Sequence, residues 1–159
     1  MLILCAMEKE AENIKVKDAE IIITGIGVWN ILKKAKLITH STSKKVVNVG
    51  YAGSSEYDVG SVLSVNKVKT EKYSNVVETP ALSIKPFDIQ ATTCITANGF
   101  VIGGGSLPLV DMELYYLTLM FPQIQSLKIV SDNLNYDEYT QFNTKDSWDK
   151  VNEILNKGV

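Results

Sequence analysis

The chain has 159 residues, of which 45% are hydrophobic and 21% charged, and its formal charge is -2. These values predict one globular domain spanning residues 1–159, and the apolar runs are too short for a transmembrane helix. No basic cluster extends beyond residues 33–36 and the pair Lys44 and Lys45, so binding to nucleic acid has little electrostatic support.

The residue types also restrict the chemistry. Arginine is absent, and all 16 basic residues are lysines. Arginine is the usual bidentate partner of phosphate and carboxylate groups. Mechanisms in which an arginine holds an oxyanion are therefore excluded for this chain. Cys5 and Cys94 lie in apolar runs, which favours two buried, reduced thiols over a disulfide or a metal pair. His40, the single histidine, is expected at the surface, so we predict no metal site and no other cofactor.

An apolar strand at residues 1–6 opens the chain, and an acidic, helix-favouring segment follows at once at residues 7–12. The acids at this strand end either point into a site above the sheet or form the solvated first turn of a helix, where negative charge is favourable. The first ten residues lack the basic region and the long apolar run of a signal peptide, so we expect a cytoplasmic protein.

Residues 21–23 are a β-branched run that ends in Thr-Gly-Ile-Gly at residues 24–27, and a helical pattern follows at residues 29–38. A strand, Gly-x-Gly and a helix is the form of a turn whose backbone approaches an anion or a sugar. The third glycine and the Lys-Ser/Thr pair of stronger motifs are absent. A tight strand-to-helix turn is therefore the competing explanation.

Two further strands are predicted at residues 46–49 and 59–65, and the first opens into a glycine-bearing loop at residues 50–55. Residues 66–89 are polar, which predicts an exposed hairpin or loop in which Tyr73 or Phe87 could cover a ligand.

Another strand at residues 91–97 leads into the sequence Asn-Gly-Phe-Val. Phe100 in this sequence either stacks on a flat ligand or is a core aromatic at a strand end.

Residues 110–133 form the clearest unit. Two acids, the second of them Glu113, precede an apolar run at residues 114–121 as at a helix N-terminus, and a proline ends the run. Residues 127–131 are a β-rich strand that stops at Asp132. Because ligands bind at the carboxyl ends of strands in open α/β sheets, Asp132 and Glu113 are the first carboxylates to consider for chemistry.

A terminal amphipathic helix is predicted at residues 147–155. Strands alternate with helical segments through much of the chain, and six strands are expected in all. This alternation predicts an α/β fold with a central mixed, mostly parallel twisted sheet covered by helices on both faces, in three αβα layers.

Five short motifs, in the same order and at strand ends, resemble the nucleoside phosphorylase superfamily. They are most similar to its hydrolytic branch, the 5'-methylthioadenosine/S-adenosylhomocysteine nucleosidases. Residues 6–10 (AMEKE) resemble Ala-Met-Glu-Glu-Glu, residues 24–27 (TGIG) the Gly-Ile-Gly turn, and residues 48–53 (NVGYAG) the Asn-Thr-Gly-Ser-Ala-Gly loop. Residues 110–113 (VDME) match Val-Asp-Met-Glu, and residues 131–132 match Ser-Asp.

The chain departs from that family in several places. It is shorter than a typical member, and residues 66–89 lack helical material that carries dimer and substrate contacts. Tyr51 replaces a small residue, Asn98 stands in the position of an acidic one, and Lys128 stands where an arginine is usual. These changes bear on the substrate more than on the fold.

The resemblance implies hydrolysis of the N-glycosidic bond of a purine nucleoside or a 5'-thio-substituted nucleoside, as in nucleoside metabolism and methionine salvage. Asp132 would protonate the departing base at N7, which requires partial burial to raise its pKa. Glu10 would orient or deprotonate the attacking water, and Glu113 would accept the ribose hydroxyls.

The matched motifs also imply contacts with the nucleoside. Met112 would pack on the ribose and Phe100 would stack on the base, with the backbone of Val101 at the base edge. The remaining implied substrate-binding positions are Gly25, Tyr51, Ala52, Gly53 and Ser131.

Three alternatives follow from the same residues. The absence of arginine favours water over phosphate as the nucleophile, although lysine or a helix N-terminus can bind phosphate. Tyr51, Asn98 and the shortened middle favour a catalytically impaired protein that binds a nucleoside or a partner. The joint presence of three acids at strand ends favours catalysis.

Relatives are dimers or hexamers, so a homo-oligomer, a dimer in the first instance, is expected, with residues 114–121 or the loop near Tyr73 in contact.

Overall fold

The computed structural model describes residues 1–39, 45–70, 80–103, 105–141 and 144–157. The predictions for His40 and Tyr73 lie outside these residues. No helix within the described ranges combines the length and the apolar character that crossing a membrane requires.

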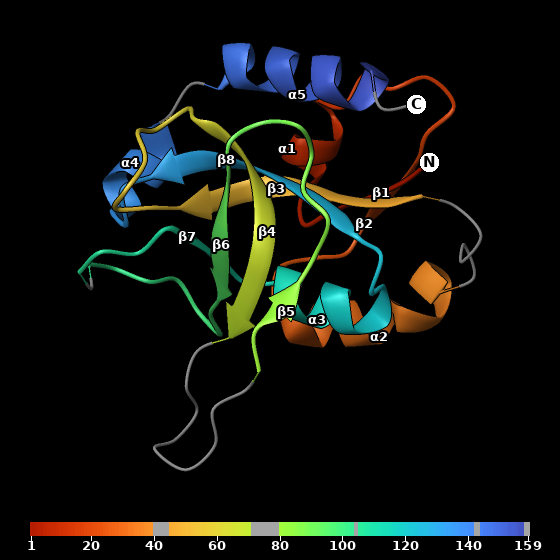
Figure 1. Cartoon of the computed structure of the whole chain (residues 1–159), viewed down its shortest axis with the longest axis horizontal. Coiled ribbons are helices and arrows are strands. Elements are labelled where there is room, and N and C mark those ends of the chain that lie inside the picture. The colour runs from red at the N-terminus through yellow and green to blue at the C-terminus, as the bar shows by residue number, and fades with distance from the viewer. Residues whose placement is uncertain (40–44, 71–79, 104, 142–143, 158–159) are drawn as a thin grey trace.

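In the described part of the chain, eight strands and five helices follow one another (Figure 1). The strands are β1 (Leu2–Cys5), β2 (Glu20–Ile23), β3 (Val46–Gly53), β4 (Val62–Thr70), β5 (Leu82–Ser83), β6 (Ala91–Thr96), β7 (Leu109–Asp111) and β8 (Gln125–Asp132). The helices are α1 (Glu8–Ala11), α2 (Val28–Thr39), α3 (Leu114–Met120), α4 (Tyr136–Gln141) and α5 (Lys145–Lys157). All six predicted strands are present, whereas the short β5 and β7 and the polar α4 were not predicted.

The sheet is mixed and mostly parallel, as predicted. Strands β2, β1, β3 and β8 lie side by side and parallel, and so do β4, β6 and β7. Antiparallel pairing joins β4 to β8 along one edge and β3 to β7 at Gly53 and Val110. Strands β3, β8, β4, β6 and β7 therefore close a ring, from which β1 and β2 extend. Three αβα layers describe an open sheet, whereas five of these strands form a ring. The three-layer arrangement therefore stays a prediction.

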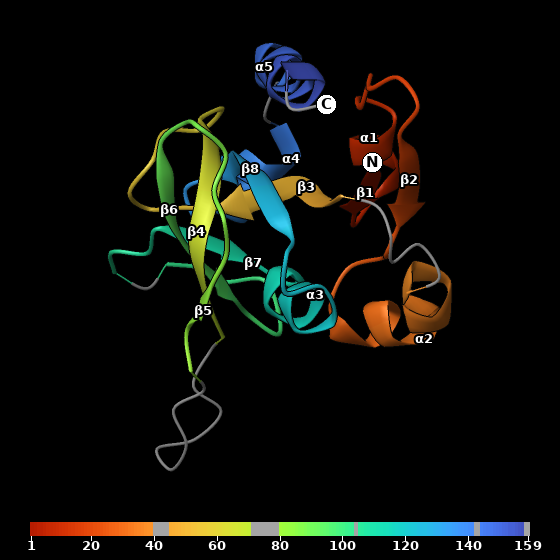
Figure 2. The same cartoon turned by 45° about the vertical axis from the view of Figure 1, so that its right-hand side comes forward.

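Helices lie on opposite sides of the sheet (Figures 1 and 2): α1 and α5 on one side, α2 and α3 on the other. On the α2 and α3 side, Ile31 and Leu117 pack against strand residues such as Leu4 and form one part of the core. On the α5 side, Trp148 and Leu155 contribute to a second buried cluster. The terminal helix α5 is therefore amphipathic, as predicted, and its apolar side packs against the core.

The segment at residues 66–89 was predicted as an exposed hairpin or loop. The antiparallel pairing of β4 with β5 confirms the hairpin, whereas the predicted exposure is only partly correct. Strand β4 continues to Thr70, and Val68, Ile84 and Phe87 are buried. Apolar residues spaced among lysines and prolines carry the packing here, so the average polarity of the segment was misleading.

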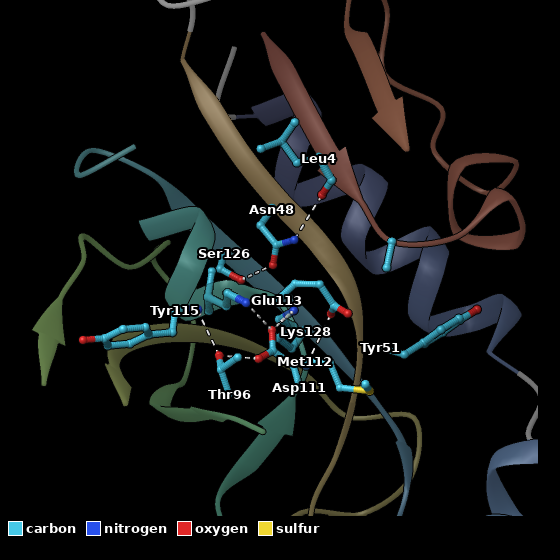
Figure 3. Close-up of polar contacts among 12 residues, drawn as sticks. Leu4, Asn48, Tyr51, Thr96, Asp111, Met112, Glu113, Tyr115, Ser126 and Lys128 are labelled. Carbon is cyan, nitrogen blue, oxygen red and sulfur yellow. Dashed lines mark hydrogen bonds and ion pairs between the residues drawn. The ribbon is translucent and has the colours of Figure 1, made fainter. Parts of the chain in front are cut away.

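The parallel register brings several strand ends to one edge. Strands β1, β3 and β8 run in the same direction, and Gly53 at the end of β3 pairs with Asp132 at the end of β8. A buried polar ladder joins the three strands, because Asn48 donates to the carbonyl of Leu4 and accepts from Ser126 (Figure 3). This edge carries the candidate site.

Candidate active site

A cavity of about 200 Å³ opens at the carboxyl ends of these strands. The acids Glu10, Glu113 and Asp132 come from α1, the β7–α3 junction and β8, and all three line this cavity. Nine of the eleven predicted site residues lie in its lining: Glu10, Tyr51, Ala52, Gly53, Phe100, Met112, Glu113, Ser131 and Asp132.

The other two predicted residues lie elsewhere. Val101 lines a smaller adjoining cavity of about 40 Å³, which shares Phe100 and Asp132 with the larger one. Gly25 is outside the lining of both cavities. Its φ of 84° and its tight approach to Asn30 fit the turn that starts α2, which was the competing explanation for this glycine.

Glu10 is buried and held by three backbone N–H groups. Its Oε2 accepts from Ala6 and Met7 at 2.8 Å each, and its Oε1 accepts from Tyr51 at 2.9 Å. A side chain at Gly50 would stand 2.9 Å from Oε1, so glycine there makes room for the carboxylate. Glu10 thus fixes the start of α1 to the end of β3, and its orientation toward the cavity is rigid.

The burial of Glu10 also changes its chemistry. Removal from water raises the pKa of the carboxyl group above its ordinary value, although the three backbone N–H donors and the charge of Lys128 act in the opposite direction. A carboxyl group with a raised pKa is a better proton acceptor than an exposed one, which suits a group placed to activate water.

Glu113 precedes the first turn of α3 and faces the cavity. Its Oε1 accepts a hydrogen bond of 2.7 Å from the backbone N–H of Gly27, the second glycine of the Gly-x-Gly turn. Burial raises the pKa of Glu113 from 4.5 to about 7, the negative charges of Asp111 and Glu10 act in the same direction, and Lys128 opposes them. Glu113 therefore changes between its protonated and ionised forms near neutral pH.

This raised pKa predicts a stability change with pH. The folded chain binds the Glu113 proton more tightly than the unfolded chain, so this contribution is present below pH 4.5 and is lost as the pH rises to about 7. Between pH 4.5 and about 7, this group should lower the unfolding free energy of the wild-type protein by up to about 3 kcal/mol. Glu113→Gln should not show this decrease, because glutamine does not titrate. Urea unfolding of both proteins from pH 5 to pH 8 measures it. Parallel curves for the two proteins would contradict the prediction.

Asp132 is 2% exposed and accepts two hydrogen bonds at the cavity edge. The hydroxyl of Ser131 donates to Oδ2 at 2.6 Å, and the backbone N–H of Leu134 donates to Oδ1 at 3.0 Å. A side chain at Gly53 would stand 3.0 Å from Oδ1. Neighbours on β3 and after β8 therefore fix the direction in which this carboxyl group points.

Asp111 is a buried acid whose part in the site the sequence did not reveal. It lines both cavities and forms an ion pair with Lys128, with 2.7 Å between Oδ2 and Nζ. Figure 3 shows this pair grouped with Glu113 and Met112. The Val-Asp-Met-Glu motif contains Asp111, but no role was predicted for it, because its contact with Lys128 depends on the closed ring of strands.

Aromatic side chains surround the other end of the cavity. The ring of Phe100, 44% exposed, lies edge-on to Tyr136 and Tyr139 at centroid distances of 5.6 and 5.5 Å. Phe100 is thus not a core residue, and it lines the cavity. Met7, Ile26 and Tyr139 also line the cavity and were not predicted as site residues.

Tyr51, which replaces a small residue, does not fill the cavity. Its hydroxyl accepts a hydrogen bond of 2.9 Å from the indole of Trp148 on α5, and the two rings meet edge-on. Figure 3 shows the ring directed away from Glu113 and Asp111. A tyrosine at position 51 therefore adds a hydrogen bond to α5, and its ring does not occupy the space between the carboxylates of the cavity.

The arrangement suits acid and base chemistry on a neutral ligand. Within the described residues no three histidine, cysteine or acidic side chains are grouped so that they could hold a metal ion. The cavity instead offers several carboxyl groups in different environments, a sulfur side chain at Met112 and an exposed aromatic ring. A proton donor, a base and a hydroxyl acceptor can all be drawn from this set.

No protein-family model matches the chain, and no curated protein sequence is similar to it. Solved structures are similar in fold. The 5'-methylthioadenosine/S-adenosylhomocysteine nucleosidase from Neisseria meningitidis, in complex with methylthio-immucillin-A, matches with a TM-score of 0.78 at 14% identity over 98% of both chains. The Helicobacter pylori enzyme with butyl-thio-DADMe-Immucillin-A matches with a TM-score of 0.77 at 14% identity over 98% of this chain and 95% of that one.

The nucleosidase from Colwellia psychrerythraea 34H, in complex with adenine, has a TM-score of 0.74 at 18% identity over 98% of this chain and 92% of that one. Identities this low establish the fold and leave the activity open. The resemblance drawn from five sequence motifs is confirmed at this level: the chain has the fold of the 5'-methylthioadenosine/S-adenosylhomocysteine nucleosidases.

Proposed function

We propose that the chain hydrolyses the N-glycosidic bond of a purine nucleoside or a 5'-thio-substituted nucleoside and releases the free base. One observation carries this proposal: Glu10, Glu113 and Asp132, from three separate elements, line one cavity. Adenine and nucleoside analogues bound to the structural neighbours support a nucleoside as the ligand.

The proposed roles follow from where charge develops. Breaking the bond leaves positive charge on the sugar and negative charge on the base, so an acid at the base accelerates departure. We assign this role to Asp132 and the activation of water to Glu10. Glu113 and Met112 would hold the sugar, and Phe100 would stack on the base. Ser131, Ala52, Gly53 and the backbone near Tyr51 would complete the binding surface.

Water as the nucleophile is part of the same proposal. The chain contains no arginine, and among the residues that the structure describes no lysine lines the cavity. An anionic phosphate would therefore meet several carboxyl groups with no cation in the lining, which disfavours phosphorolysis.

A panel of nucleosides tests the proposal. The purified chain is incubated with methylthioadenosine, S-adenosylhomocysteine, a futalosine-type nucleoside and inosine, with and without phosphate, and free base is measured. Release without phosphate is the expected result. Release only with phosphate would make the chain a phosphorylase, and no release from any member would leave a nucleoside-binding protein.

We also propose that the chain is a cytoplasmic homodimer. Exposed apolar side chains on α2 and α3 support self-association, because Trp29 and Leu37 are 74% and 59% exposed and Leu119 is 58% exposed. Light scattering of the purified chain measures the mass in solution, and a monomer at all concentrations would contradict this part.

A further inference from the structure

Asp111, which lines the cavity, forms a buried ion pair with Lys128. Lys128 is on β8 and Asp111 ends β7, and their side chains are 1% and 0% exposed. Removing two charges from water costs free energy that their attraction repays only in part. A pair of apolar residues would fill the same space without this cost, so stability alone does not account for the pair.

Asp111 connects the pair to the corner that carries Glu113. Its Oδ2 accepts from the backbone N–H of Leu114 at 3.0 Å, and its Oδ1 accepts from Thr96 at 2.7 Å. Thr96 in turn accepts from the backbone N–H of Tyr115 at 2.9 Å. Asp111 and Thr96 therefore hold the first turn of α3, and the residues before it, Met112 and Glu113, are placed by this turn.

The charges around the cavity are strongly unbalanced. Glu10, Asp111, Glu113 and Asp132 line it, whereas none of the lysines in the described ranges does. Among the residues that the structure describes, Lys128 is the one buried lysine. The charge of its ammonium group acts on Glu10, Asp111 and Glu113 from the low-dielectric interior, where charges interact strongly.

We propose that Lys128 is a positioning residue of this site, which acts through Asp111 to hold the corner bearing Glu113 and supplies the counter-charge that allows Glu113 to be an anion. The groups that face Glu113 are Asp111 from β7, Lys128 from β8, Glu10 from α1 and the N–H of Gly27 before α2. An ionised Glu113 accepts hydrogen bonds from two sugar hydroxyls, whereas the protonated form gives up part of that capacity. The inference rests on the proposed function for this binding role, but its test observes the carboxyl group itself.

The test follows the ionisation of Glu113 by NMR of the protein labelled with ¹³C at glutamate carboxyl carbons. The Glu113 signal is assigned by its loss in Glu113→Gln. We expect Lys128→Met to raise the titration midpoint by about one pH unit or more, and Asp111→Asn to lower it by a similar amount. The double variant should return close to the wild-type midpoint, and Lys128→Arg should remain near it. Lys157→Met, which removes an exposed lysine of α5, is the matched control without a shift.

Opposite shifts from the two single variants distinguish an electrostatic role from a purely structural one, because a loosened corner would move the midpoint in the same direction in both. Where Lys128→Met does not remain folded, Asp111→Asn, Lys128→Arg and the double variant carry the test. An unchanged midpoint in Asp111→Asn, or a double variant that does not return toward wild type, would overturn the proposal.

The outcomes for this inference and for the proposed function are separable. A chain that releases no base but shows the opposite shifts would refute the nucleosidase proposal and retain the role of Lys128 in the ionisation of Glu113. If the chain releases base but the titration midpoint of Glu113 does not change in the Lys128 and Asp111 variants, the nucleosidase proposal is retained and the role of Lys128 is refuted. In an active chain, the acidic limb of the pH–rate profile should move with the NMR midpoint, whereas a structural defect would lower the whole profile.

Discussion

Asp132→Asn should lower the rate of base release by about 10²–10⁴-fold, the usual contribution of a general acid, with little change in the fold. The carboxamide has nearly the shape of the carboxyl group, and its oxygen can still accept from the N–H of Leu134, one of the two contacts that orient Asp132. At the other contact its NH₂ group can donate to the hydroxyl of Ser131, which reverses the direction of that hydrogen bond. What is lost is the proton for the departing base. The measurement compares base release by wild-type and variant protein at saturating nucleoside.

The leaving group provides a sharper control for the same variant. A riboside whose leaving group is a nitrophenoxide needs no proton to depart, so its cleavage should be reduced far less by Asp132→Asn than cleavage of a purine nucleoside. Asp88→Asn, which changes an exposed aspartate away from the cavity, should affect neither substrate. Equal losses on both substrates would show that Asp132 acts in binding or folding and not as the acid.

Lys128→Met should lower the free energy of unfolding by about 3–5 kcal/mol, because it leaves Asp111 buried without its counter-charge. A domain of this kind is stable by only about 5–15 kcal/mol, so the loss is a large part of the total. Asp111 would keep its bonds from Thr96 and Leu114, but neither donor carries a charge. Urea unfolding at neutral pH measures the difference.

The double variant Lys128→Met with Asp111→Asn should recover much of that loss, since no unpaired charge then remains in the interior. The size of the recovery gives the coupling free energy of the pair. A single variant that costs no more than an ordinary surface substitution, or a double variant that is the sum of the two singles, would show that the pair is not the electrostatic unit described above.

Much of the site was predictable because its residues stand at strand ends. Glu10 follows β1, and Asp132 ends β8, and each strand is an apolar or β-branched run long enough to recognise. Ligands bind at the carboxyl ends of strands in such sheets, which is why Asp132 was selected from its position, whereas Glu10 was assigned to the site only through the family resemblance. Glu113 was recognised from the acids before an apolar helix, although the three-residue strand β7 before it was not.

The parts that could not be predicted depend on contacts distant in sequence. The partner of Lys128 follows from the pairings of β8 with β4 and of β6 with β7, which close the ring. In the Gly-x-Gly turn, the backbone conformation decides that Gly27 and not Gly25 contacts Glu113. Tyr139 lies on the short polar helix α4, whose composition gave no periodic signal.

The most direct test of the nucleosidase proposal is a single-turnover measurement with the purified chain in excess over methylthioadenosine in phosphate-free buffer. After incubation the protein is denatured and the small molecules are separated. Hydrolysis at this cavity predicts that the nucleoside is converted to free base and free sugar, even where turnover is slow. Recovery of the intact nucleoside, bound by the chain but not cleaved, would contradict the proposal and leave a nucleoside-binding protein on the same fold.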